Sequence, residues 1–475
     1  MDMDFVIKMI HLHGFYAVGI KVLIAKSLIS ISTSNCLEMH DMLQEMGWAI
    51  VREQCIEEPG KRDRLWDAED IYDPHLSSKH DFKLMDIKFN YINRMLKDCG
   101  LSFQLSLSLM FNNFDLSQGL ESLPDALRYL HWLAYPLKSL PTKFSTQNLV
   151  ELRMPCSKVV GQIWNKGQKL GNLKVIDLSY CKHLTEVPDL SWSSNLEHID
   201  LCECTSLVQI PSYFQNFHKL TYLDLGGCLN LNYLPEMPVN IESLDLSKTA
   251  IKELPSSVWS LEKLCSLNVT HCKALEKLPS NSCNLKVSGT FSLKGCESLG
   301  EFSELPRYTS DLDLSETAIK ELPLLSLSTS IHKLKSLESL DLHLCSEFQY
   351  FPEILEPMEH LTSLSLSCTA VKVLPSSIGN LIGLRKLDLH DCEDLEVVPN
   401  SIYNLSNLET LNFHGCWCLG KLPPVSVDQV RLLSLKELIL AGCGIKEIPD
   451  ALVCLTSLCS LDLKDTKIKS IPASI

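Results

Sequence analysis

LTYLDLGGCLNLNYLP (residues 220–235) and LRKLDLHDCEDLEVVP (residues 384–399) are two copies of one pattern that recurs along most of this chain. Apolar residues, usually leucine, hold the first, fourth and sixth positions, and Cys or Thr holds the ninth. From Leu173 onward the pattern recurs thirteen times, with starts 21 to 28 residues apart. Two looser copies precede it, LRYLHWLAYPLKSLP from Leu127 and LVELRMPCSKV from Leu149. Self-similarity at such a period indicates a repeat architecture.

The spacing within each copy predicts how the repeats fold. Each L-x-L segment forms a short strand whose side chains alternate, so both leucines point into the core and the residue between them points outward. No repeat can bury its leucines alone, and stacking the repeats gives a curved parallel sheet. Leu-Pro pairs such as Leu234-Pro235 follow the strands, and proline cannot donate to a ladder, so turns and short 3₁₀ pieces are expected there. We therefore predict an α/β leucine-rich repeat solenoid, a horseshoe with a parallel concave sheet.

The ninth position explains much of the count of twenty cysteines. Where the chain turns away from the strand, it needs a small buried side chain that can hydrogen-bond to nearby backbone, and both Cys and Thr qualify. The alternative, metal binding by Cys202 with Cys204 or by Cys416 with Cys418, lacks a second pair at ligand spacing. We therefore expect structural cysteines and no metal site. The position is Cys at 181, 204, 228, 272, 296, 345, 392, 416 and 443, and Thr at 249, 317, 369 and 466.

An outward-facing column of aspartates is the main candidate for ligand binding. The residue between the second and third leucines is Asp in eight of thirteen repeats. Like charges on neighbouring strands are unfavourable, so the column needs a reason. One interpretation is an acidic concave face for a basic ligand segment; the other is a habit of this repeat class, with each Asp solvated or bonded to a hydroxyl such as that of Ser247 or Ser315. The eight residues are Asp177, Asp200, Asp224, Asp245, Asp313, Asp341, Asp388 and Asp462.

Histidines near the same face do not indicate catalysis. His271, His343, His390 and His414 have no acid–base partner at a definable distance in the sequence. Surface positions explain them better than a catalytic role does. We therefore predict no catalytic residue and no enzyme activity for this chain.

Composition and charge exclude several other classes. The chain is 45% apolar and 21% charged, which is typical of a globular protein. A net charge of −15 argues against a nucleic-acid partner and against a polybasic membrane anchor. The start, MDMDFVIKMIHLHGF, lacks the basic residues of a signal peptide, and no run reaches the length of about 18 apolar residues that spans a membrane. We expect a cytoplasmic chain with reduced cysteines, with the nucleus as an alternative location.

The front of the chain has a different pattern. In CLEMHDMLQEMGWAIVREQ (residues 36–54), Asp41 and Gln44 resemble a capping box, and apolar residues follow at helical spacing. Before it, VLIAKSLISIS (residues 22–32) alternates and is rich in β-branched residues, which predicts a strand pair or a helix running into a strand. This combination is typical of a small winged-helix-like domain ahead of the solenoid.

Several stretches closely resemble one family. GFYAVGIKVLIAKSLISIS (residues 14–32), the Met39-His40-Asp41 motif and EPGKRDRLWDAEDIY (residues 58–72) resemble the end of the nucleotide-binding (NB-ARC) module of plant intracellular immune receptors. In particular they resemble the class with a Toll/interleukin-receptor-like domain (TIR-NBS-LRR). LPDALRYLHWLAYPLKSLP and NLVELRMPCSKV, within residues 123–159, resemble the first repeats of that family. The resemblance implies a disease resistance protein acting in plant innate immunity.

The resemblance also implies a nucleotide contact. In that family the motif His approaches the phosphates of bound ADP, so this role falls on His40, and the full-length family binds ADP or ATP. This chain carries no G-x-x-x-x-G-K-[ST] phosphate loop, and one histidine cannot replace its cradle of backbone amides. For the chain by itself we therefore expect no cofactor, and we interpret Asp41 as a helix cap.

We predict three regions: a winged-helix-like remnant of the NB-ARC module at 1–58, a linker with a degenerate first repeat at 59–122, and about fifteen repeats at 123–475. The last repeat stops at Ile475, so we expect a truncated family member or a part of a larger receptor. The expected function is sensing of a pathogen effector or a guarded host protein, together with autoinhibition through the NB-ARC module. The alternative is a stand-alone scaffold or decoy without signalling output.

Overall fold

The computed structural model describes residues 29–31, 37–39, 86–87, 123, 127–280, 283–286, 289–302, 305–306, 309–322, 336–424, 430–449, 452 and 454–469. The chain forms two compact units. The first comprises Met1–Trp132 and Lys143–Glu151, and the second comprises Leu133–Thr142 and Leu152–Ile475.

Two short strand pairs lie among the described residues of the first unit. β1 (Ile29–Ile31) pairs antiparallel with β2 (Leu37–Met39), so a strand occurs at the end of the stretch 22–32 as expected, but its partner follows that stretch and does not lie within it. β3 (Asp86–Ile87) pairs in parallel with β4 (Tyr129–His131), the strand of the first loose repeat. The predicted helix from Asp41 lies outside the described residues.

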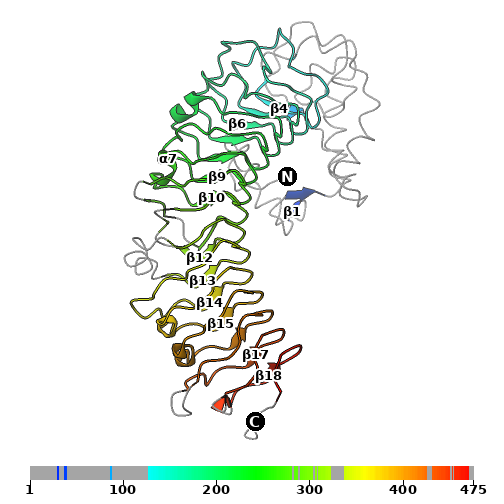
Figure 1. Ribbon diagram of the computed structural model, residues 1–475. Coiled ribbons are helices and arrows are strands. Elements are labelled where there is room, and N and C mark those ends of the chain that lie inside the picture. The colour runs from blue at the N-terminus through cyan, green and yellow to red at the C-terminus, as the bar shows by residue number, and fades with distance from the viewer. Residues whose placement is uncertain are drawn as a thin grey trace. The chain divides into compact units, whose positions relative to one another are not determined.

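The second unit is a stack of parallel strands, one from each repeat (Figure 1). All thirteen regular repeats supply a strand, as their spacing predicts, and β5 (Glu151–Arg153) comes from the second loose copy. The thirteen strands are β6 (Val175–Asp177), β7 (His198–Asp200), β8 (Tyr222–Asp224), β9 (Ser243–Asp245), β10 (Ser266–Asn268), β11 (Gly289–Ser292), β12 (Thr309–Asp313), β13 (Ser339–Asp341), β14 (Ser363–Ser365), β15 (Lys386–Asp388), β16 (Thr410–Asn412), β17 (Glu437–Ile439) and β18 (Ser460–Asp462).

The core of this unit runs through the stack because the leucines of each repeat face those of the next. In β8 and its turn, Leu223 and Leu225 are fully buried while Asp224 between them is half-buried. Burying one such leucine contributes about 1.5–3 kcal/mol, so each repeat depends on its neighbours for most of its stability. The strands form two parallel sheets, β3 to β10 and β11 to β18, so β10 and β11 are not paired as strands. The repeats still stack there, since the backbone N–H of His271 donates to the Lys294 carbonyl at 2.6 Å.

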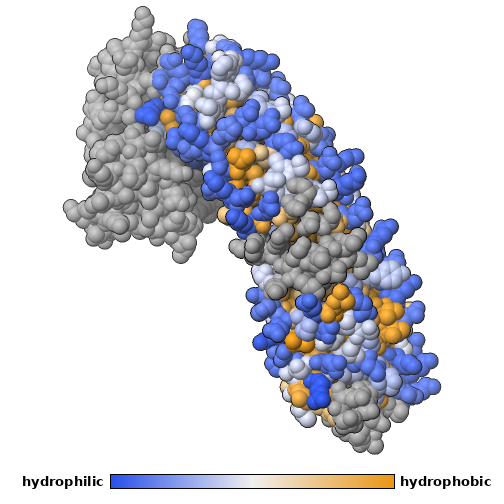
Figure 2. All heavy atoms as spheres, turned by 90° about the vertical axis from the view of Figure 1, so that its left-hand side faces the viewer, coloured by the Kyte–Doolittle hydropathy of each residue, from blue (hydrophilic) through white to orange (hydrophobic). Residues whose placement is uncertain are grey.

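The edge opposite the strands is built of turns, as the Leu-Pro pairs predict. Three 3₁₀ segments, η4 (Ser212–Asn216), η5 (Ile378–Asn380) and η6 (Asn400–Asn404), lie there together with one α-helical turn, α7 (Ser256–Trp259). Neighbouring repeats are joined at this edge by isolated bridges, such as those of Tyr350 with Val373 and of Val373 with Val397. Seen from this side, the surface is mostly hydrophilic, with separate apolar areas (Figure 2).

Candidate recognition face on the parallel sheet

Each of the eight predicted aspartates is the last residue of its strand. In every case Oδ1 accepts a hydrogen bond from the backbone N–H two residues ahead, at 2.8 to 3.2 Å. This is an Asx turn, in which a short acceptor side chain replaces a backbone partner. Three serines at that second position also donate their hydroxyl to the same oxygen: Ser179 at 2.7 Å, and Ser247 and Ser315 at 2.6 Å. The carboxylates therefore stabilise the turns that follow the strands, independently of any ligand.

Asparagine performs the same turn-capping task where the column lacks Asp. Asn268 Oδ1 accepts from the Thr270 N–H at 3.1 Å, and Asn412 Oδ1 accepts from the His414 N–H at 2.9 Å. Each amide then donates sideways to the aligned carboxylate of the preceding strand. Asn268 Nδ2 lies 2.7 Å from Asp245 Oδ2. An uncharged residue thus caps the turn and also relieves the charge column.

Four aspartates in direct register make the most crowded part of the column. Asp177, Asp200, Asp224 and Asp245 stand side by side on β6 to β9. Burial, followed by the charge of Asp177, raises the pKa of Asp200 to about 7. Burial, together with Asp245, also raises the pKa of Asp224. Arg153, whose Nη1 lies 3.9 Å from Asp177 Oδ2, places a cation at one end of this row.

An aromatic pair lies beside the same row. The rings of His198 and Tyr222, which begin β7 and β8, are stacked with centroids 4.1 Å apart and an angle of 6° between their planes. The Tyr222 hydroxyl donates to Asp224 Oδ2 at 3.2 Å. Both side chains are half-buried, so this stretch of the sheet offers acidic and aromatic groups together.

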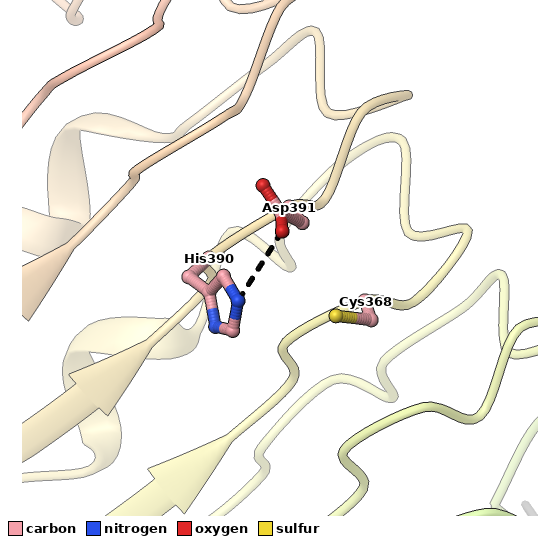
Figure 3. A group of neighbouring side chains, drawn as sticks. All are labelled: Cys368, His390 and Asp391. Atoms are coloured by element: carbon pink, nitrogen blue, oxygen red, sulfur yellow. Dashed lines mark ion pairs between the residues drawn. The ribbon is translucent and has the colours of Figure 1, made fainter.

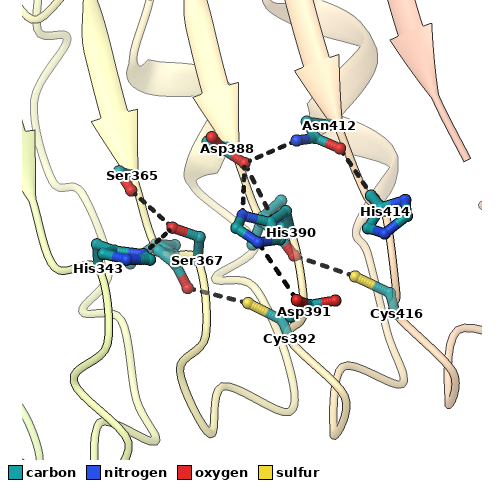
Figure 4. Close-up of polar contacts among 12 residues, drawn as sticks. His343, Ser365, Ser367, Asp388, His390, Asp391, Cys392, Asn412, His414 and Cys416 are labelled. Carbon is teal, nitrogen blue, oxygen red and sulfur yellow. Dashed lines mark hydrogen bonds and ion pairs between the residues drawn. The ribbon is translucent and has the colours of Figure 1, made fainter.

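Histidines dominate the corresponding region of β13 to β16 (Figure 4). The rings of His343 and His390 have centroids 6.2 Å apart, as do those of His390 and His414. Nδ1 of His343 lies 2.8 Å from the Ser367 hydroxyl, which in turn lies 3.1 Å from that of Ser365. The turns that follow these strands therefore add imidazole groups beside Asp341 and Asp388 of the aspartate column.

The ninth-position cysteines form a buried structural ladder. Each Sγ donates to a backbone carbonyl of the preceding repeat at 2.9 to 3.3 Å, as Cys392 and Cys416 do in Figure 4. The threonines bond instead within their own turn, as Thr249 Oγ1 does to the Leu246 carbonyl at 2.7 Å. Burial raises the pKa of the Cys181 thiol to about 12, so this thiol stays protonated at neutral pH. The structural interpretation of this position is confirmed.

A separate cysteine lies close to one of these histidines. Cys368, His390 and Asp391 bring sulfur, nitrogen and oxygen atoms within 4.8 Å of one another (Figure 3). Nε2 of His390 lies 3.3 Å from Asp391 Oδ2. Burial and then the charge of Asp391 raise the pKa of the Cys368 thiol, which is opposite to the activation that a nucleophilic cysteine needs. A nucleophilic role for Cys368 is therefore not supported, whereas the spacing of the three donor atoms is one that could hold a cation.

Cys368 was not predicted as a ligand because no second cysteine lies near it at ligand spacing in the sequence. Cys368 and Asp391 both immediately precede a ladder residue, one repeat apart, so an alignment of the repeats at that offset would have brought them together. His40, the family's ADP contact, and Asp41 lie outside the described residues. Ligand binding by the aspartate column stays a prediction, since the hydrogen bonds by which the carboxylates cap the turns already explain their positions.

Comparisons with known proteins agree with this architecture. Residues 333–422 match the family model of disease resistance protein RPS4B-like leucine-rich repeats, and residues 1–55 match the Roq1-like winged-helix domain. Disease resistance-like protein DSC1 of Arabidopsis thaliana is 31% identical over 82% of this chain and 36% of its own length. Disease resistance protein RPS6 of the same plant is 31% identical over 74% of this chain and 37% of its own. The chain thus spans about a third of the length of these relatives.

A solved leucine-rich repeat protein of Leptospira interrogans is 20% identical, with a TM-score of 0.40 over 71% of this chain and 84% of that one. Among the residues that the structure describes, no helix has the length and hydropathy needed to cross a membrane. The winged-helix match at the front and the repeat match behind it occur in the order that the resemblance implied. The chain therefore belongs to the plant disease resistance proteins of the TIR-NBS-LRR type, which it matches over their winged-helix and leucine-rich repeat regions.

Proposed function

We propose that the sheet face of the second unit binds a pathogen effector or a guarded host protein. The same repeats would help to hold the receptor inactive, through contact with its NB-ARC module, until that partner arrives. The observation that carries the proposal is the parallel stack itself, in which backbone groups pair between repeats. A partner therefore meets outward side chains, and their pattern along the stack can encode specificity.

The charge of the face indicates what kind of partner fits its first half. Asp177, Asp200, Asp224 and Asp245 are crowded there and half-buried. Lys or Arg side chains of a partner would relieve this crowding, and opposite charges across an interface speed association and give specificity. The stacked pair that includes Tyr222 adds an aromatic surface, the type of residue that most often dominates binding energy.

The proposal includes no chemical reaction. The aspartates serve as turn caps, and the ladder thiols are bonded to carbonyls. We also propose that the chain alone holds no nucleotide and acts in the cytoplasm, while ADP or ATP would be bound by the NB-ARC module of a full receptor. Purified chain that bound ADP tightly or cleaved NAD would contradict this part of the proposal.

Charge reversal on the two sides of the stack tests the recognition face. The full chain is co-expressed in leaf tissue with cloned effectors of its host's pathogens, and association is read by co-purification. Asp177→Lys with Asp224→Lys should abolish the association. Glu253→Lys, on the opposite edge, where Glu253 bridges to Lys277, should leave it intact. Equal binding by both variants would place the recognition surface elsewhere.

Autoinhibition needs an intact receptor for its test. Receptor that carries these repeats should stay silent in leaf tissue, and deletion of the repeats should trigger cell death without an effector. Silence after deletion would refute the inhibitory role. Cell death triggered by this chain alone would count against the alternative of a passive decoy.

A further inference from the structure

Three side chains with different donor atoms converge beside β15. One ligand atom each from Cys368, His390 and Asp391 lies within 4.8 Å of the other two. Over the part of the chain that the structure describes, this is the one group of three Cys, His, Asp or Glu side chains that meets this spacing. All three residues are half-buried, so an ion could reach them from solvent.

The repeat geometry, and not a chance arrangement of side chains, produces this convergence. Cys368 and Asp391 occupy the same position in successive repeats, immediately before the ladder residues Thr369 and Cys392. Both have a left-handed backbone, with φ of 56° for Cys368 and 53° for Asp391. Because β14 and β15 are paired, the two side chains leave adjacent turns next to each other. Figure 3 shows the Cys368 sulfur directed toward His390.

We propose that Cys368, His390 and Asp391 bind a divalent transition-metal ion of the zinc type. Zn²⁺ accepts thiolate sulfur at about 2.3 Å, imidazole nitrogen at about 2.0–2.1 Å and carboxylate oxygen at about 2.0–2.2 Å. A tetrahedron with these bonds separates its ligand atoms by roughly 3.3–3.7 Å. The group therefore has to contract by roughly 1 Å at its widest, which side-chain rotation can supply.

The surroundings of His390 match those of a metal-bound imidazole. Metal-ligating histidines usually have their second ring nitrogen directed at a carboxylate, which fixes the ring. Nδ1 of His390 lies 4.0 Å from Asp388 Oδ1, while Nε2 faces Asp391. The Asp388 carboxylate is fixed in place, since its Oδ1 accepts from the backbone N–H of His390 at 3.2 Å and from Asn412 Nδ2 at 3.0 Å. A small rotation of the ring would complete the carboxylate–histidine–metal arrangement.

The donor types exclude other common ions. Mg²⁺ and Ca²⁺ prefer oxygen ligands alone, whereas a thiolate with an imidazole selects zinc and its neighbours in the first transition row. Three protein ligands leave a fourth position for water or for a donor from a bound protein. The site does not depend on effector recognition, and its test needs no partner.

Cobalt substitution tests the proposal directly on the purified, reduced full chain. Co²⁺ bound to a thiolate produces a sulfur-to-metal charge-transfer absorption, which reports the Cys368 ligand itself. We expect one equivalent of Co²⁺ to give this absorption and one equivalent of Zn²⁺ to remove it. In competition with a chromogenic chelator, Cys368→Ser and His390→Gln should each weaken Zn²⁺ binding by about 100-fold or more, since even loss of a supporting residue typically costs about 10–100-fold.

Cys418→Ser is the control, because the Cys418 thiol is accessible to solvent but lies outside the group. It should keep both the absorption and the Zn²⁺ affinity. Circular dichroism establishes that each variant is folded, and His390→Gln keeps the test decisive if Cys368→Ser unfolds. Absorption that persists in Cys368→Ser, or affinity that is unchanged in His390→Gln, would show that other thiols bind the ion and would overturn the proposal.

Discussion

Replacing Asp200 by Asn should stabilise the protein, although it removes a residue of the candidate binding column. The unfolded chain gives Asp a pKa near 4, and burial together with Asp177 raises that of Asp200 to about 7 in the fold. At about 1.4 kcal/mol per pH unit this corresponds to about 4 kcal/mol at most. Asp200 is only half-buried, so we expect solvent screening to leave a gain of about 1–3 kcal/mol in the free energy of unfolding.

The pH dependence has a defined sign. Because the folded state holds the Asp200 proton more tightly, its ionisation destabilises the fold progressively as pH rises from about 4 to about 7. Asp200→Asn should therefore gain most above about pH 8 and lose its advantage as pH falls toward about 4. Asn keeps the acceptor that caps the turn, as Asn268 and Asn412 do in the same column. Asp200→Ala removes the oxygen that accepts from the Cys202 N–H at 3.0 Å. Its free energy of unfolding should therefore be lower than that of Asp200→Asn by about 1–3 kcal/mol.

Urea denaturation followed by circular dichroism, at several pH values, measures these differences on the full chain. Asp462→Asn is the control, because Asp462 is exposed and stands opposite Ile439 instead of another carboxylate. It should change stability little at any pH. If Asp200→Asn were less stable than the unaltered chain above about pH 8, the charge itself would be needed and the reasoning would fail.

Three further predictions concern the turns and the ladder. Gly227 has a φ of 73°, and a Cβ added there would meet the Glu203 side chain. Gly227→Ala should therefore lower the free energy of unfolding, measured by urea denaturation, by about 1–2 kcal/mol. Gly420→Ala should lower it less, because nothing lies within 4 Å of a Cβ added there. Equal losses would contradict a special backbone at Gly227. Cys392→Ala removes a donor to the Leu366 carbonyl at 2.9 Å and should cost about 1 kcal/mol or more. Thiol reagents should label the exposed Cys418 in the native state and label Cys392 only after unfolding; early labelling of Cys392 would argue against a closed ladder.

The repeat pattern predicted the parallel stack of the described repeats because each feature of it is a local requirement. A buried leucine pair defines each strand, a Leu-Pro pair ends the opposite segment, and Cys or Thr closes the turn. These requirements act within about twenty residues and repeat thirteen times, so a wrong prediction for one repeat does not alter the prediction for the next. Cys and Thr both meet the predicted need for a small buried hydrogen-bonding side chain there, as Cys272 and Thr249 show by donating to the same Leu246 carbonyl.

The candidate site was harder to predict because it depends on contacts across repeats. The sequence offered a hydroxyl partner for some aspartates, which the Ser247 contact confirms, but the backbone N–H that every Asp caps needs the turn conformation. Cys368 and His390 are 22 residues apart, and only the register of β14 on β15 brings them together. An alignment of the repeats shows that Cys368 and Asp391 share a position, but the distances between their side chains follow only from the stack.

The turn also limits how much recognition the aspartate column can encode. The strand's last position needs a short acceptor, so Asp, Asn and Ser account for twelve of the thirteen repeats and Ile439 is the exception. The position that begins each strand carries no such requirement, and it varies from His198 and Tyr222 to Lys386 and Glu437. Specificity for a partner should therefore depend more on this freer position. Tyr222→Ala should weaken effector association with little loss of stability, whereas Asp224→Ala should lower stability first, since it removes the cap of the Gly226 N–H at 2.9 Å. Unfolding and co-purification measured on both variants separate the two roles. If Asp224→Ala weakened association more than Tyr222→Ala did, with less loss of stability, the aspartates would be the main determinants of specificity.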